Sequence, residues 1–117
     1  MVKEDCIFCQ IANGKVPTEM VYENEDVACF KDNAPQTKVH LLLVPKEHYK
    51  DILELSEDGL DEATKLLKAL HTVVKQENLE EHGFRVINNC GKGAGQSVKH
   101  VHFHIMSDPD KLKTTLV

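Results

Sequence analysis

The feature that most constrains this chain is a run near its end in which histidine alternates with large apolar residues. The run spans 100–106 and reads His-Val-His-Phe-His-Ile-Met. Alternation of period two predicts a β-strand, and β-branched and aromatic residues are common in strands. Since alternate side chains of a strand point to one side, His100, His102 and His104 are expected to share a face. Three titratable rings are costly to bury, so the pattern favours a chemical role.

Two kinds of chemistry suit histidines at alternate strand positions: zinc binding, and nucleophilic attack on a carbonyl or phosphorus centre. His100 and His104 would lie about 13 Å apart on a straight strand, whereas zinc–nitrogen bonds are about 2 Å long. One ion therefore cannot bind all three rings. The alternative is a histidine-rich strand face that has no chemical function. The segment before the strand argues against this alternative.

A glycine-rich segment, 88–97, leads directly into this strand and reads Asn-Asn-Cys-Gly-Lys-Gly-Ala-Gly-Gln-Ser. Its glycines allow backbone conformations in which successive N–H groups converge on an anion. The spacing matches neither the dinucleotide-binding nor the P-loop fingerprint, and a strand rather than a helix follows. Alone, such a loop more often simply connects a hairpin. Beside three histidines it predicts a phosphate site next to a nucleophile.

This combination resembles the histidine-triad (HIT) family, whose signature alternates three histidines with apolar residues and ends in two apolar positions. Residues 100–106 fit that signature at every position. The similarity extends upstream through 95–98, 84–89, 40–48 and 6–11, and so covers nearly the whole chain. The Hint branch of nucleoside phosphoramidate hydrolases is the most similar. The resemblance implies an α+β fold with a five-stranded antiparallel sheet, and a homodimer.

Length and composition limit the remaining possibilities. A chain of 117 residues predicts a single domain over 1–117, and its 41% hydrophobic and 28% charged content is typical of soluble globular proteins. The net charge of −5 argues against a general nucleic-acid binder. The sequence shows neither a signal-peptide pattern nor an apolar run of membrane-spanning length. We therefore expect a cytoplasmic protein with neither nucleic acid nor membrane as a partner.

A second chemical motif is the Cys-x-x-Cys pair Cys6 and Cys9. A redox pair of this kind normally follows a strand, yet only five residues precede Cys6. Two thiolates would need two more ligands for a tetrahedral zinc site, and His40, His48 and His100 are the available donors. Two buried free cysteines without a metal are the alternative. The family resemblance implies Cys6, Cys9, His48 and His100 as zinc ligands, which would make the role of His100 structural.

The rest of the chain predicts an antiparallel sheet with helices on one face. One short and one long helix are expected over 6–13 and 56–78, and strands over 20–23, 27–31, 39–44 and 84–89. The long helix is indicated by apolar residues at steps of three and four, with Ser56 as its N-cap. The last of these strands should form a hairpin with the histidine strand. This order of elements is typical of the α+β class.

The family resemblance also implies the roles of the histidines in a two-step hydrolysis of nucleoside 5′-phosphoramidates. His102 would attack phosphorus, and water would hydrolyse the resulting nucleotidyl-histidine. His104 would contact the phosphate and assist proton delivery, and His100 would help to orient His102. His40 alone would more often be a satisfied core histidine, but the resemblance places it beside the triad, where it would orient the rings by hydrogen bonding.

The nucleotide-binding residues implied by the resemblance fall into two groups. Asp32 alone would more often cap the turn at 32–36, but in the family this position binds the ribose hydroxyls. The base of a purine nucleotide would lie among Ile7, Phe8, Ile11, Phe30 and Asn33. The phosphate would be bound by Asn89, Gly95, Gln96 and Ser97.

Two other functions stay open from the sequence: dinucleoside polyphosphate hydrolysis, and a zinc-stabilised nucleotide-binding or interaction module with little catalysis. A histidine rather than a glutamine at position 104 argues against the nucleotidyltransferase branch. Hint proteins usually continue after the triad with a glycine pair and a tryptophan-containing tail. Segment 107–117 has neither, which leaves the substrate preference open.

Overall fold

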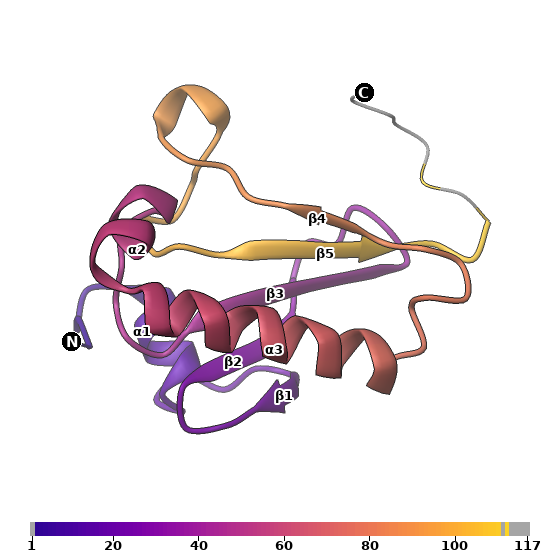
Figure 1. Ribbon diagram of the computed structural model, residues 1–117, viewed down its shortest axis with the longest axis horizontal. Helices are drawn as coiled ribbons and strands as arrows, with labels where there is room; N and C mark the ends of the chain where they lie inside the picture. Colours follow the sequence, from indigo (N-terminus) through magenta and orange to yellow (C-terminus); the bar gives the residue numbers. More distant parts are fainter. Residues whose placement is uncertain (1, 111, 113–117) are drawn as a thin grey trace.

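The fold is described from a computed structural model that describes residues 2–110 and 112 (Figure 1). In this part of the chain five strands form one antiparallel sheet, in the order β1-β2-β3-β5-β4. The strands are β1 (Met20–Glu23), β2 (Val27–Lys31), β3 (Val39–Pro45), β4 (Arg85–Ile87) and β5 (Phe103–Ser107). The helices are α1 (Ile7–Ala12), α2 (Ile52–Asp58) and α3 (Leu60–Gln76), with a 3-10 turn, η1 (Lys92–Ala94), in the glycine-rich loop. The expected α+β fold with a five-stranded antiparallel sheet is confirmed.

Helices cover both faces of the sheet, so the expectation of helices on one face is wrong. Side chains that alternate along a strand separate into two cores. Leu43 and Ile105 pack with Val73 of α3, whereas Leu42 packs with Phe8 of α1. In Figure 1, α3 crosses in front of the sheet and α1 lies behind it. Because α1 has only six residues, it covers much less of its face than α3 does.

The predicted long helix is two helices in the structure. Asp51, not Ser56, is the first N-cap, and its carboxylate accepts the N–H of Glu54 at 3.0 Å. Ser56 lies inside α2, and Gly59 ends α2 and begins α3. A Cβ atom at Gly59 would lie 2.6 Å from ring carbon Cζ of Tyr49. The helix therefore breaks at a residue that a tyrosine ring approaches too closely for any side chain.

Two strands are shorter than the sequence predicts. The strand β5 begins at Phe103 rather than His100. Just before it, the N–H of Val101 donates to the carbonyl of Tyr49 at 2.7 Å instead of pairing in the sheet. The strand β4 has only three residues, but it pairs antiparallel with β5 and places Ile87 opposite His104. The expected pairing of these two segments is therefore confirmed.

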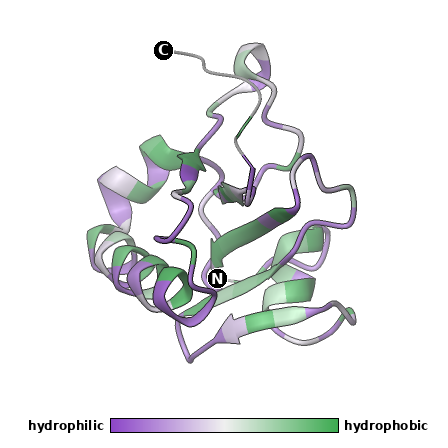
Figure 2. Cartoon of the chain, turned by 90° about the vertical axis from the view of Figure 1, so that its right-hand side faces the viewer, coloured by the Kyte–Doolittle hydropathy of each residue, from purple (hydrophilic) through white to green (hydrophobic). Residues whose placement is uncertain are grey.

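Hydrophobic residues concentrate on the central strands and on one side of the long helix (Figure 2). None of the described helices has the length and apolar character needed to cross a membrane. In the tryptophan-free tail 107–117, positions 111 and 113–117 lie outside the described residues.

Candidate active site

The catalytic candidates His102 and His104 lie on the face of the sheet that α1 covers. Strands β3 and β5 pair so that Leu42, which packs under α1, is directly opposite His104. Residues directly opposite in antiparallel strands share a face. The ring centroids of His102 and His104 are 5.2 Å apart, and Phe8 of α1 lies edge-on to His102 at 5.0 Å. The alternation in the sequence therefore brings both rings to one place.

The main chain fixes the tautomer of His102. Its Nδ1 lies 2.7 Å from the carbonyl oxygen of His100. A carbonyl oxygen can only accept a hydrogen bond, so Nδ1 of the neutral ring carries the proton and Nε2 keeps a lone pair. An unprotonated nitrogen of this kind is what a nucleophilic histidine requires. The expected orienting effect of His100 on His102 thus has a physical basis in its carbonyl, not its ring.

His40 and His104 form a hydrogen-bonded pair beside Asp32. Nε2 of His40 lies 2.8 Å from Nδ1 of His104 and 3.4 Å from Oδ2 of Asp32. The other carboxylate oxygen of Asp32 accepts the N–H of Ala34 at 2.8 Å. Asp32 therefore caps its own turn with one oxygen and faces the histidine pair with the other.

Burial sets the charge of this pair. Burial lowers the pKa of His40, and burial together with the neighbouring histidines lowers the pKa of His104. The carboxylate of Asp32 opposes both shifts. Since the ordinary pKa of histidine is about 6.5, both rings are mostly neutral near pH 7.

A cavity of about 480 Å³ opens between α1 and the sheet, beside His102 and His104. Its walls combine apolar and polar residues. The following residues expected around a nucleotide line it: Ile7, Phe8, Ile11, Phe30, Asp32, Asn33 and Ser97. The segment Val16, Pro17 and Thr18 also lines it, and no motif in the sequence would have selected these residues.

The expected phosphate-binding residues are not all brought together. Ser97 lines the cavity, whereas Asn89, Gly95 and Gln96 are not among its described lining residues. Asn88, which sequence reasoning missed, donates from Nδ2 to the carbonyl of His102 at 2.9 Å. Two adjacent asparagines carry no local signal of which side chain contacts the histidine segment.

The side chain of Gln96 holds the glycine-rich loop in shape. Its Nε2 donates to the carbonyls of Lys50 and Val98 at 2.7 and 3.0 Å, and its Oε1 accepts the N–H of Gly91 at 2.8 Å. Gly91 and Gly95 have φ angles of 89° and 83°, a region that favours glycine. The glycines and Gln96 together give the loop the shape that carries Ser97 to the cavity.

A second cluster of polar side chains consists of Cys6, Cys9, His48 and His100. One ligand atom from each residue lies within 4.8 Å of the others. The sulfurs of Cys6 and Cys9 lie 3.3 and 3.4 Å from Nδ1 of His100, and Nδ1 of His48 lies 3.3 Å from the sulfur of Cys9. A tetrahedral zinc ion would place sulfur and nitrogen ligands about 3.6 Å apart. These four residues are positioned to hold a metal ion.

The surroundings of His100 fit a metal ligand. Its Nε2 lies 2.9 Å from the carbonyl oxygen of Pro45, so Nε2 carries the proton and Nδ1 faces the thiols with a lone pair. Burial lowers the pKa of His100 to about 4 and raises the pKa of Cys9 to about 11. A cation at the centre would favour the thiolate. The donor set therefore suits a divalent ion that binds sulfur and nitrogen.

Comparison with known proteins decides the family. Residues 13–110 match the pattern of the HIT domain. The chain belongs to the HIT family. An uncharacterized HIT-like protein from Methanocaldococcus jannaschii is 45% identical over 101 residues, which are 86% of this chain and 77% of that protein.

Solved HIT structures have the same fold as this chain. A histidine triad protein from Clostridium difficile has a TM-score of 0.91 and 40% identity, with 98% of this chain and 99% of that chain covered. A HIT family hydrolase from Clostridium thermocellum has a TM-score of 0.88 and 36% identity, with 97% and 99% covered.

The three histidines of the HIT signature have three different surroundings in this chain. The ring of His100 lies with Cys6 and Cys9. The rings of His102 and His104 line the cavity, and His104 also pairs with His40. The signature thus combines a ring positioned to hold a metal ion, a ring with a free nitrogen and a ring in a hydrogen-bonded pair.

Proposed function

We propose that this HIT protein hydrolyses nucleoside 5′-phosphoramidates to a nucleoside monophosphate and an amine. The observation that carries the proposal is the lone pair on Nε2 of His102 at a nucleotide-sized cavity. The aromatic walls Phe8 and Phe30 suit a purine base, and the carboxylate of Asp32 suits ribose hydroxyls. Membership of a family that includes a protein named as a hydrolase agrees with this function.

The reaction would proceed in two displacements at phosphorus. Nε2 of His102 forms a bond to phosphorus while the phosphorus–amine bond breaks and the amine leaves with a proton from His104. Water then attacks phosphorus and returns a proton to His104, the bond to Nε2 breaks, and the monophosphate and the free His102 ring are released. The carbonyl of His100 stabilises the positive charge on His102 during the first step, because it accepts the hydrogen bond of Nδ1–H. His104 and Ser97 would bind the phosphate oxygens.

The first test is AMP release from adenosine 5′-phosphoramidate by the wild type and by His102→Ala. We expect turnover by the wild type and a loss of at least about 10³-fold in the variant, because the nucleophile is removed. His71→Ala changes an exposed histidine on α3 and serves as the matched control.

Three results would count against this function in different ways. Equal turnover by wild type and His102→Ala would exclude His102 as the nucleophile. Turnover of diadenosine polyphosphates without turnover of the phosphoramidate would show a nucleotide, not an amine, as the leaving group. No turnover of either substrate by the folded wild type would favour a binding module.

We also propose zinc as the ion of the Cys6, Cys9, His48 and His100 cluster. Two thiolates and two imidazoles in a closed set are typical of structural zinc. The ligands come from the start of α1, from the segment after β3 and from the segment before β5. Zinc would supply a cross-link between these three segments, and it takes no part in the displacement at phosphorus.

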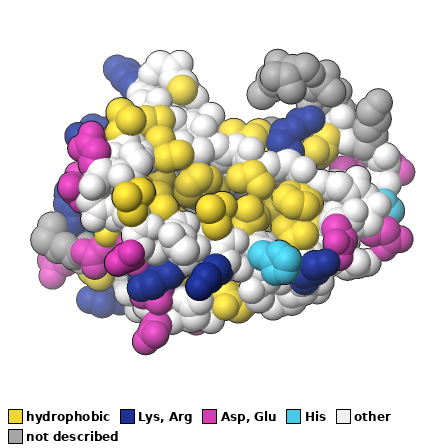
Figure 3. All heavy atoms as spheres, viewed as in Figure 1, with side chains coloured by type: hydrophobic (Ala, Val, Ile, Leu, Met, Phe, Trp, Pro, Cys, Tyr) yellow, Lys and Arg dark blue, Asp and Glu magenta, His cyan; other side chains and the backbone are white. Residues whose placement is uncertain are grey.

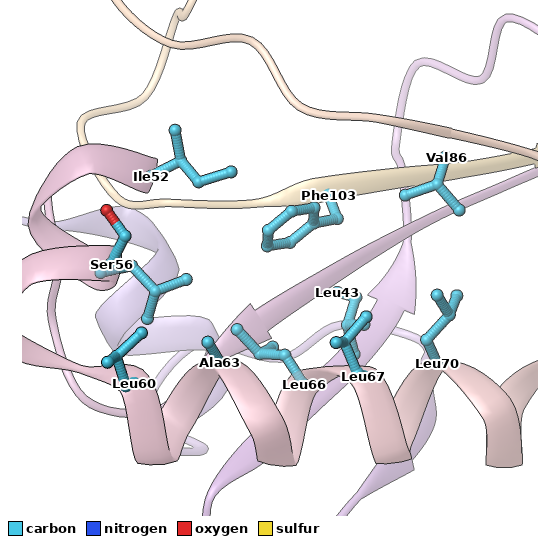
Figure 4. Close-up of a pocket in the computed structure, with 11 residues that line it drawn as sticks. Leu43, Ile52, Ser56, Leu60, Ala63, Leu66, Leu67, Leu70, Val86 and Phe103 are labelled. Atoms are coloured by element: carbon cyan, nitrogen blue, oxygen red, sulfur yellow. The ribbon is translucent and has the colours of Figure 1, made fainter.

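The partner proposed for the opposite face of the sheet is a second copy of this chain, as the HIT resemblance implies. An apolar groove lies there between α2, α3 and the sheet (Figures 3 and 4). Leu60 and Leu67 on its helical side are 65% and 68% exposed, and Phe103 and Val86 lie on its sheet side. Among its described lining residues, Ser56 is the only polar one. A continuous apolar surface beside the edge strand β4 is typical of an interaction site.

A further inference from the structure

The segment that precedes β3 contacts His40 through a main-chain group. The N–H of Gln36 donates to Nδ1 of His40 at 3.0 Å. Because an amide N–H can only donate, Nδ1 must carry the lone pair, and the proton of the neutral ring lies on Nε2. That Nε2 is the atom 2.8 Å from Nδ1 of His104. His40 therefore donates to His104.

The same logic assigns the proton of His104. Its Nδ1 accepts from His40, so the proton of the neutral His104 ring lies on Nε2. Nδ1 faces His40, which leaves Nε2 as the nitrogen available to the cavity that His104 lines. Asp32 is the weaker acceptor for His40, at 3.4 Å against 2.8 Å. The donors and acceptors thus run in one direction, from the Gln36 amide through His40 to His104.

We propose that the main-chain amide of Gln36 is a positioning group that fixes the tautomers of His40 and His104, so that His104 presents an N–H to the substrate. This inference rests on the proposed hydrolysis, in which that N–H binds a phosphate oxygen or protonates the leaving amine. With the opposite tautomer, Nε2 of His104 would carry a lone pair. That lone pair and the negatively charged phosphate oxygens would repel each other. The role of His104 therefore depends on a residue outside the histidine signature.

In the opposite arrangement of protons, two hydrogen-bond donors would face each other at Nδ1 of His40. If His104 donated to Nε2 of His40, the proton of the neutral His40 would lie on Nδ1 and would face the Gln36 N–H. His40 is only 6% exposed, so water cannot replace the lost hydrogen bond there. An unsatisfied buried donor of this kind disfavours its tautomer by about 5- to 150-fold.

The amide also distinguishes this cluster from a metal site. Asp32, His40 and His104 offer three ligand atoms within 4.8 Å of one another. A metal ion on Nε2 of His40 would require Nδ1–H, again opposite the Gln36 N–H. At His100 the nitrogen that faces away from the cysteines meets a carbonyl instead. The carbonyl of Pro45 at His100 leaves a lone pair on the nitrogen that faces the cysteines, as a metal ligand requires. The N–H of Gln36 at His40 leaves a proton on the nitrogen that faces His104, as a hydrogen-bond donor requires.

The decisive measurement is the imidazole ¹⁵N chemical shift in the full-length protein by NMR at neutral pH, because the shift reports which nitrogen carries the proton. We expect a protonated Nε2 and an unprotonated Nδ1 on both His40 and His104. A protonated Nδ1 on His40 would overturn the inference even if the enzyme turns over. The expected shifts without any hydrolysis would overturn the proposed function and leave the tautomer assignment standing.

Two variants test the amide itself. Gln36→Pro removes the N–H, whereas Gln36→Ala keeps it and should keep the wild-type shifts. In Gln36→Pro we expect mixed tautomers at His40 and a fall in kcat of about tenfold or more, with KM changed by less than about twofold. Wild-type shifts and kcat in a folded Gln36→Pro would overturn the proposal. Should that variant fail to fold, the wild-type shifts decide alone.

Discussion

At the scale of single residues, the tautomers of three buried histidines follow from the main-chain group that each ring contacts. The carbonyl of Pro45 fixes the proton of His100, the carbonyl of His100 fixes that of His102, and the N–H of Gln36 fixes that of His40. A main-chain group has only one hydrogen-bonding role, unlike an imidazole. The folded backbone therefore gives chemically identical side chains different tasks.

Buried neutral histidines also make the stability of the protein depend on pH. Burial lowers the pKa of His40 and His104. As the pH falls below about 6.5, the unfolded chain binds protons that the folded chain does not, so stability decreases. We expect the free energy of unfolding to decrease as the pH is lowered from about 7 to about 5.

Urea denaturation at a series of pH values measures this effect. His40→Gln should reduce the slope of stability against pH between about 6.5 and 5. The exposed control His71→Gln should retain the wild-type slope. A protein that becomes more stable on acidification over this range would contradict the assignment of neutral rings.

The sequence could predict which histidines take part but not how their protons are arranged. His102 and His104 follow from alternation, and Cys6 and Cys9 from spacing. The tautomers depend on main-chain atoms as far as 55 positions away, as between His100 and Pro45. No pattern of side-chain types reports such a contact.

At the scale of elements, one tyrosine lies at two of the boundaries that the sequence did not predict. The ring of Tyr49 occupies the space beside Gly59, where α2 ends and α3 begins, and its carbonyl binds the N–H of Val101 ahead of β5. Strands β1 and β2 have the predicted bounds, because alternation and the turn between them are local signals. The contacts of Tyr49 join segments far apart in the sequence, and periodicity along the chain cannot detect them.

Gly59→Ala should destabilise the fold by about 1–3 kcal/mol, because the new methyl group would overlap the ring of Tyr49. The backbone at Gly59 has φ −134°, so the effect is steric and not conformational. Thermal unfolding followed by circular dichroism measures it. Gly93→Ala, whose new Cβ meets open space, is the control, and equal stability of the two variants would contradict the steric explanation.

At the scale of the whole molecule, the two faces of the sheet have separate uses. His104 faces the cavity under α1, and its neighbour Phe103 faces the groove under α3. The alternation of β5 thus places catalytic candidates on one side and an apolar surface on the other. The cavity and the groove therefore lie on opposite faces of the sheet.

Leu67→Asp should convert a homodimer into a monomer, because it places a charge in the apolar groove. Sedimentation velocity at micromolar concentration should give twice the chain mass for the wild type and the chain mass for this variant. Leu53→Asp is the matched control: Leu53 is 61% exposed but does not line the groove. A monomeric wild type, or a Leu67→Asp variant that still dimerises, would contradict the proposed interface.

Cys9→Ser should abolish metal binding and lower the Tm, because the cross-link between the N-terminal segment and the segment before β5 is lost. Elemental analysis of the purified protein should find one zinc ion per chain in the wild type and almost none in the variant. Cys90→Ser, which lies outside the cluster, should keep its zinc. Equal metal content in the two variants would show that these four residues do not form the site.

A substitution at His100 would change its side chain but not its main-chain carbonyl. Its ring lies with the cysteines, while its main-chain oxygen holds His102. Every amino acid at position 100 would supply that same oxygen. A substitution at position 100 can therefore remove a candidate metal ligand without removing the carbonyl that contacts His102. The proposed zinc site and the proposed nucleophile can therefore be altered separately in engineered variants.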